Sequence, residues 1–128
     1  MKTTSLIARI LLGALFVFAG SNHLFNFLPK QPMPPGAAGQ FLTGMVGIGY
    51  INFIGICEVA AGLLLIINQF VPLGLTILAA FVVNIFVINV LIMPKALPVA
   101  VIMVILWLLG AWRFRALFLP LLRHKPAD

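Results

Sequence analysis

A single carboxyl group stands within an apolar stretch of this 128-residue chain. Glu58 is the only acidic residue before the C-terminal Asp128. An ionised carboxylate inside a bilayer is costly, so we expect Glu58 to be protonated, paired with a cation or in contact with water. His23 is the candidate partner, because the other histidine, His124, lies in a basic C-terminal tail.

Asparagines are the other polar residues within apolar stretches that could take part in chemistry. At 1.5 Å per helical residue, His23 lies roughly 8 Å below the outer end of its stretch, and Glu58 and Asn84 lie roughly 12–14 Å below theirs. We therefore expect one polar cavity in the outer half of the membrane. The predicted ligand-binding or proton-relay residues are Glu58, His23, Asn22, Asn84, Asn52 and Asn89.

The same residues do not form a complete catalytic or metal centre. They supply neither a nucleophile–base pair nor a metal triad, so catalytic residues and metal ligands are not predicted. The single cysteine, Cys57, excludes an intrachain disulfide and a Cys-x-x-Cys motif. An enzyme acting alone is the least expected function, and redox work would need a cofactor or a partner.

A purely structural interpretation of the polar residues stays open. A neutral or hydrogen-bonded Glu58 can fix the register of neighbouring helices, as polar groups in membranes do for about 1 kcal/mol or less. The asparagines can act in the same way, and Cys57 can serve as a small buried apolar residue.

Composition places these residues in a membrane protein. The chain is 63% hydrophobic and 8% charged, with a mean hydropathy of +1.22, too apolar for a water-soluble surface. Its length allows one domain of about four spans, since each crossing takes about 20 residues. The net charge is +6, and six of the eight basic residues lie near the two ends of the chain beside apolar runs. This placement favours a role in orienting the chain in the membrane over nucleic-acid binding.

Prolines divide the sequence into the expected elements of an all-α transmembrane four-helix bundle. A proline-rich stretch over 29–39 predicts an irregular outer loop with Phe41 and Met45 packed beneath it. Residues 40–49 are compatible with a short re-entrant or interfacial helix. The expected spans cover about 5–28, 50–67, 72–93 and 97–112, followed by a basic tail over 113–128.

The basic residues predict that both termini are cytoplasmic. One side of the expected bundle holds six of them and the other holds two, and cytoplasmic loops carry the excess of lysine and arginine. Trp107 and Trp112 then anchor the inner interface, and the basic apolar tail suits an anionic lipid surface. The six are Lys2, Arg9, Arg113, Arg115, Arg123 and Lys125; the two are Lys30 and Lys95.

Small residues indicate which helix faces pack closely. Gly13 and Gly20 lie seven residues apart in the first span, and Gly55, Glu58 and Gly62 share one stripe of the second. Such stripes allow close helix approach in membranes, so we expect Glu58 to point toward the first span. The fourth span has no polar side chain at this level and is expected to face lipid or another subunit.

The first two expected spans contain motifs that resemble those of the DoxX-like family of small bacterial membrane proteins. The resemblance is carried by Arg9-x3-Gly13, by the Phe16–His23 segment FVFAGSNH and by the Gly55–Leu65 segment GICEVAAGLLL, and it extends over about residues 6–115. It implies a four-span bundle with an intramembrane glutamate, in the bacterial cytoplasmic membrane. Members are associated with thiosulfate:quinone oxidoreductase assemblies and other membrane redox complexes. Similar proteins often have a histidine in the third span where this chain has Asn84 or Asn89, so bis-histidine haem or a multi-histidine metal site is not expected.

Two functions from different classes remain open. In the first, the chain is a membrane accessory or binding subunit whose outer cavity takes a lipophilic molecule such as a quinone, beside a membrane or soluble oxidoreductase. Glu58 and His23 would then bond its oxygen atoms and relay protons. In the second, it is a structural or assembly protein with a packed core and no ligand, and homo-oligomerisation is compatible with either.

Overall fold

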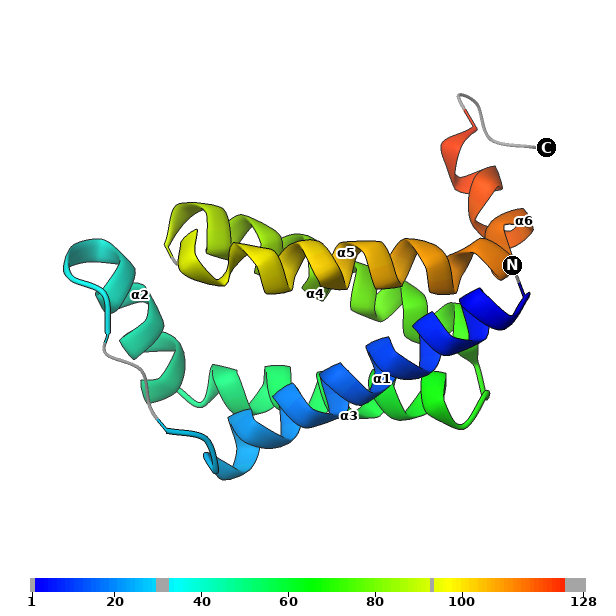
Figure 1. The fold of residues 1–128 in the computed structure, drawn as a ribbon. Helices are drawn as coiled ribbons and strands as arrows, with labels where there is room; N and C mark the ends of the chain where they lie inside the picture. Colours follow the sequence, from blue (N-terminus) through cyan, green and yellow to red (C-terminus); the bar gives the residue numbers. More distant parts are fainter. Residues whose placement is uncertain (1, 30–32, 93, 124–128) are drawn as a thin grey trace.

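The chain folds into helices joined by short connections (Figure 1). The computed structural model describes residues 2–29, 33–92 and 94–123. Within these ranges the elements are α1 (Lys2–Phe25), α2 (Gly36–Gly47), α3 (Tyr50–Ile66), α4 (Val71–Leu91), η1 (Pro94–Ala96), α5 (Leu97–Ala111), η2 (Trp112–Phe114), α6 (Arg115–Phe118) and η3 (Leu119–Leu122).

Three helical segments are long and apolar enough to cross a bilayer. They are α1, α4 and the run Pro94–Leu122, which joins α5 to the short helices after it. The α2–α3 pair passes the same test only together, and it bends by 75° at its break. The described residues therefore contain three candidate spans, or four if the bent pair is one span, and the prediction of an all-α membrane bundle is confirmed.

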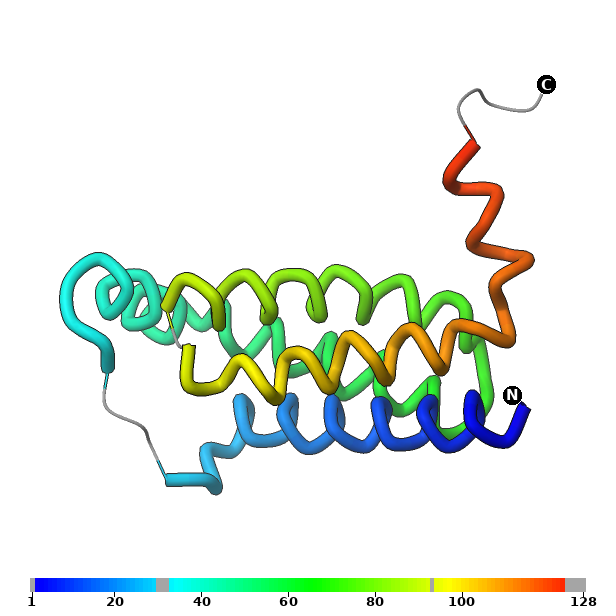
Figure 2. The backbone as a smooth tube through the Cα atoms, turned by 45° about the horizontal axis from the view of Figure 1, so that its top comes forward, coloured from blue at the N-terminus to red at the C-terminus, as the bar shows by residue number. Residues whose placement is uncertain are grey.

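The four long helices pack as a ring of neighbours (Figures 1 and 2). α1 contacts α3 and α5, and α4 contacts the same two helices, with the α1–α3 interface the most extensive. Apolar side chains from all four fill the centre, including Leu12, Phe16, Leu65, Leu75, Leu78 and Met103. Two polar contacts add to this packing: Trp107 Nε1 donates to the Leu75 carbonyl at 2.8 Å, and Ser5 Oγ donates to the Gly110 carbonyl at 3.1 Å.

The first helix is shorter than predicted, because the backbone conformation of one asparagine ends it. α1 ends at Phe25 rather than near Leu28, because Asn26 adopts a left-handed backbone with φ of 52°. The side chain of Asn22 then accepts a hydrogen bond from the Leu28 N–H at 3.0 Å. Pro29 was predicted to end the helix, but the turn at Asn26 ends it first.

The proline-rich segment differs from the predicted irregular cap. α2 begins at Gly36, so the last part of the expected loop is helical, while residues 30–32 lie outside the described ranges. The expected short helix over 40–49 is present as α2, and it is not continuous with α3. Phe41 is 51% exposed, so the prediction that it packs beneath a loop is wrong: α2 turns away from the bundle axis and leaves this ring on the surface (Figure 1).

The segment after α5 leaves the bundle at the end where α1 begins (Figure 2). η2, α6 and η3 follow one another, and none of them has a buried residue. Leu117, Leu119, Leu121 and Leu122 are all more than half exposed there. This end of the molecule thus combines the start of α1 with an apolar, basic tail.

Candidate functional site

His23 and Glu58 form the one close contact between a basic and an acidic side chain in the described part of the chain. The His23 Nδ1 to Glu58 Oε1 distance is 3.4 Å. The Glu58 side chain is only 2% exposed, whereas that of His23 is 32% exposed. The pair therefore connects a carboxyl group in the helix interface with a ring that reaches the surface.

Glycines bring the two side chains together. A Cβ on Gly20 would lie 2.6 Å from the Gly55 carbonyl oxygen, and a Cβ on Gly55 would lie 2.8 Å from the Gly20 oxygen. The same Gly20 position is 3.0 Å from the Glu58 Cβ, so α1 and α3 cross here in backbone contact. Gly13 and Gly62 repeat this reciprocal contact two turns away, at 2.7 Å in each direction. The expectation that Glu58 points toward α1 is confirmed.

The pair has unused hydrogen-bonding capacity. His23 Nδ1 and Glu58 Oε2 are both buried atoms with no hydrogen-bond partner among the described residues. The 3.4 Å separation exceeds the 2.7–2.9 Å typical of a charge-assisted bond. A ring nitrogen and a carboxyl that share one proton keep a net charge of zero whichever of them holds it. The arrangement can therefore move a proton between interior and surface, or bond a third group.

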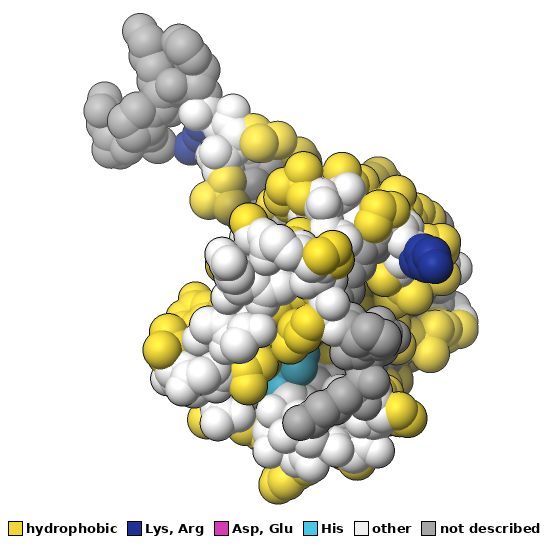
Figure 3. All heavy atoms as spheres, turned by 90° about the vertical axis from the view of Figure 1, so that its left-hand side faces the viewer, with side chains coloured by type: hydrophobic (Ala, Val, Ile, Leu, Met, Phe, Trp, Pro, Cys, Tyr) yellow, Lys and Arg dark blue, Asp and Glu magenta, His cyan; other side chains and the backbone are white. Residues whose placement is uncertain are grey.

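His23 lies near the end of the bundle that carries α2. Figure 3 views the molecule from this side, and a histidine ring is visible between neighbouring side chains. It belongs to His23, the only histidine that the structure describes. No acidic side chain is visible on this face, in keeping with the burial of Glu58.

The predicted asparagines occupy different environments. Asn22 is half-buried and accepts the Leu28 N–H, as described above. Asn52 is exposed. Asn84 is also exposed, and its amide donates to the Ala80 carbonyl of its own helix at 2.8 Å. Asn89 is buried and donates to the Ala96 carbonyl at 3.3 Å, across the turn that leads to α5. Of the six predicted site residues, only His23 and Glu58 are in polar contact with each other.

A second buried polar contact was not anticipated from the sequence. Arg9 is only 5% exposed, and its Nη1 donates to the Asn68 side-chain oxygen at 2.6 Å. Its Nε atom has no partner among the described residues. The sequence predicted Arg9 to be a charge that orients the chain and part of the motif Arg9-x3-Gly13, and neither prediction gave it a polar partner. The available signal was the i, i+4, i+8 spacing of Ser5, Arg9 and Gly13, which places Arg9 on the packed stripe of α1.

Comparison with known proteins identifies the family. A model of the DoxX family matches residues 4–93. The chain belongs to the DoxX family. Neither the curated proteins nor the solved structures provide a match.

The DoxX match covers the helices that carry the pair. It includes α1 with His23 and α3 with Glu58, and it ends at the turn after α4. The segment from α5 onward in this DoxX-family protein lies outside the match. Within the described residues, no group of three or more His, Cys, Asp or Glu side chains is close enough to hold a metal ion.

Proposed function

We propose that this DoxX-family protein is a membrane accessory or binding subunit in which His23 and Glu58 bind a lipophilic, hydrogen-bonding molecule and relay a proton to it. The observation that carries the proposal is the unpaired Oε2 of a carboxyl that is almost fully buried beside a partly exposed imidazole. Burying polar atoms without partners is costly, so a site that keeps them is a candidate for ligand or proton binding.

A quinone is the ligand class that suits this chemistry. Its two carbonyl oxygens accept hydrogen bonds, and its reduction to the quinol takes up two electrons and two protons. The histidine–glutamate pair would deliver protons, and an oxidoreductase partner would deliver the electrons. The other predicted ligand contacts, Asn22, Asn52, Asn84 and Asn89, stay predictions in this proposal.

The proposed location is the bacterial cytoplasmic membrane with cytoplasmic termini. Lys2, Arg113, Arg115 and Arg123 belong to the segments at one end of the bundle, and Lys95 belongs to the turn at the other. This distribution supports the orientation, since lysine and arginine gather on the cytoplasmic side. The pair would then lie nearer the outer face.

Glu58→Gln tests the function directly. Glutamine keeps the size of the side chain and can form neutral hydrogen bonds, but it can neither ionise, carry the relayed proton nor take part in a charge-assisted hydrogen bond. We expect the folded variant to bind decylubiquinone at least about tenfold more weakly, as for the loss of a hydrogen bond to a charged group. Binding is measured on the purified protein in neutral detergent, with circular dichroism to verify folding.

Thr76→Val is the matched control. Thr76 is a polar residue of α4 whose hydroxyl bonds the Pro72 carbonyl of its own helix at 2.8 Å, so its replacement leaves the pair intact. If Glu58→Gln binds the quinone as well as Thr76→Val does, the binding proposal is wrong.

A structural role is the second candidate, and the glycine contacts favour it. Glu58 lies between Gly55 and Gly62, where α3 meets α1 at backbone distance, so its carboxyl fills the most closely packed interface of the bundle. On this interpretation Glu58→Gln retains both packing and any bound partner, whereas Glu58→Ala loses stability through the cavity that it leaves.

A further inference from the structure

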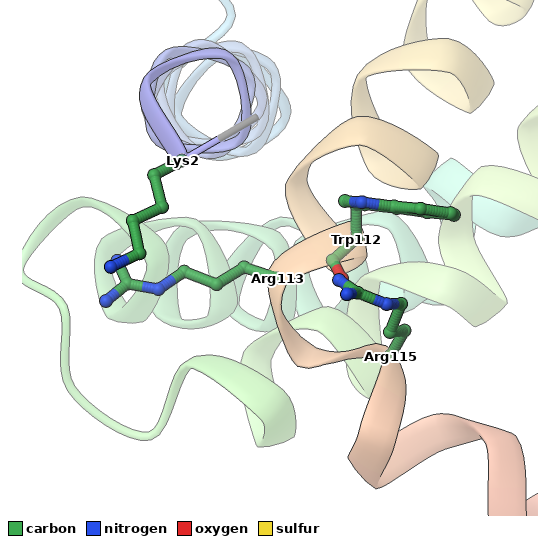
Figure 4. A pocket seen from close by; sticks show the side chains of 4 residues that line it. All are labelled: Lys2, Trp112, Arg113 and Arg115. Atoms are coloured by element: carbon green, nitrogen blue, oxygen red, sulfur yellow. The ribbon is translucent and has the colours of Figure 1, made fainter.

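A pocket of about 570 Å³ opens where the start of α1 meets the segment after α5 (Figure 4). It is lined by Lys2 of α1, by Trp112 and Arg113 of η2, and by Arg115 of α6. The side chains of Lys2 and Arg113 extend toward each other across it (Figure 4). Two cations from opposite ends of the sequence therefore share one space.

These cations have no carboxylate partner in the described part of the chain. Glu58 is the only acidic residue there, and it is buried beside His23. Like charges that converge without a counter-charge repel each other, so their arrangement is stabilised when an anion joins them.

Arg115 is held in place by Trp112. Its Nη1 donates to the Trp112 carbonyl at 2.9 Å, and its guanidinium carbon lies 4.8 Å from the centre of the indole ring. Stacking and this bond orient the planar guanidinium, which has five N–H donors in total. Most of its donors are left to bind another group, and a phosphate oxygen is the acceptor that a guanidinium fits best.

The surroundings of the pocket favour a lipid over a soluble anion. Trp112 is 48% exposed, and tryptophan is enriched where bilayer and water meet. The exposed Leu117 and Leu121 follow in the segment that leaves the bundle, and they offer apolar surface to acyl chains. A dissolved phosphate would use the cations alone.

We propose that this pocket binds the headgroup of an anionic phospholipid. Lys2 and Arg113 meet at its phosphate on one side of η2, and Arg115, held by Trp112 on the other side (Figure 4), donates to another oxygen of the headgroup at the interface. All four residues lie outside the segment that matches the DoxX family, residues 4–93, so the site is a property of this chain's own ends. It is independent of the His23–Glu58 pair and of any quinone.

Lipid binding is measured by native mass spectrometry of the full chain released from neutral detergent. Dioleoyl-phosphatidylglycerol and dioleoyl-phosphatidylcholine are added in separate titrations, because they share acyl chains and differ in net charge. We expect the anionic lipid to bind more tightly. Arg113→Gln and Arg115→Gln should each weaken its binding about fivefold, the effect of losing one direct hydrogen bond to the headgroup.

Arg123→Gln is the matched control, because it removes the same charge from the same end of the molecule without lining the pocket. We expect it to leave binding of phosphatidylglycerol unchanged. Equal loss in Arg123→Gln and Arg113→Gln would overturn the site in favour of a diffuse surface charge.

Two further results would overturn the proposal. Equal binding of both lipids, or displacement of phosphatidylglycerol by equimolar inorganic phosphate, would show that no anionic lipid site exists here. If Arg113→Gln fails to fold, Lys2→Gln takes its place with the same expected loss. Arg113→Lys keeps the charge but not the planar fork, and it should bind the lipid with an affinity between those of the wild type and the glutamine variants.

Discussion

Replacing Gly20 by alanine should separate α1 from α3 and weaken the histidine–glutamate contact. The added Cβ would lie 2.6 Å from the Gly55 carbonyl oxygen, and real Cβ atoms essentially never come closer than 3.0 Å. The helices must therefore separate by about 0.4 Å to reach that limit, and by about 0.8 Å to reach an ordinary contact. Overpacking of this kind costs about 1–3 kcal/mol, and neighbouring backbone cannot rotate away as a side chain can.

The same displacement acts on the pair. Glu58 Cβ is 3.0 Å from the Gly20 Cβ position, so it moves with the contact. A shift of about 0.4–0.8 Å lengthens the 3.4 Å His23–Glu58 separation to about 4 Å, still farther from the distance at which the two groups could share a proton. We therefore expect Gly20→Ala to lower stability and quinone binding together.

Unfolding in mixed detergent micelles, followed by circular dichroism, measures the change in stability. Gly44→Ala is the control, because Gly44 lies in α2 with nothing within 4 Å of its Cβ position. Alanine there should be neutral or stabilising by up to about 1 kcal/mol, through helix propensity. If Gly20→Ala is as stable as Gly44→Ala, α1 and α3 are not in backbone contact and the argument from glycine packing is refuted.

Three further predictions concern the rest of the bundle. Asn68→Gly preserves the left-handed backbone at φ 59° but removes the acceptor of Arg9, so it should cost about 1–3 kcal/mol of unfolding free energy, and Asn68→Ala should cost about 1 kcal/mol more. Equal stability of the two variants in the same micelle assay would contradict the backbone argument. Trp107→Phe removes the bond to the Leu75 carbonyl and should cost about 0.6–1 kcal/mol, with Trp107→Leu losing ring packing as well. A reporter fused after Asp128 should be active in its cytoplasmic form, and a translocated signal would reverse the proposed orientation.

Residue types and local spacing were enough to predict the membrane class, the main helices and the direction of Glu58. Long apolar runs dictate helices, because the bilayer provides no partner for free backbone groups. Glycines seven residues apart mark the face on which backbones approach, and Glu58 shares that stripe with Gly55 and Gly62. These properties depend on neighbours in the sequence, so the sequence alone reveals them.

The direction of several side chains depended on tertiary structure, because the depth of a residue along its helix does not say which neighbours it meets. Asn84 and Glu58 were predicted at similar depths, but apolar residues occur on every face of α4, so its sequence has no pattern that indicates which way Asn84 points. Its side chain is exposed. The sequence did not indicate that Arg9 is buried, because its partner Asn68 lies in the distant turn between α3 and α4. In the same way, the bend between α2 and α3 leaves Phe41 exposed.

The pocket lined by Lys2, Trp112, Arg113 and Arg115 shows most clearly what the sequence determined and what the tertiary structure determined. The sequence by itself determined that basic residues flank the apolar ends and that the chain belongs in a membrane. Only the packing of α5 against α1 brought Lys2 to Arg113, because residues this far apart in sequence meet through the contacts of the helices that carry them. Local composition thus decided where each residue lies along its helix, and helix packing decided which of them share a site.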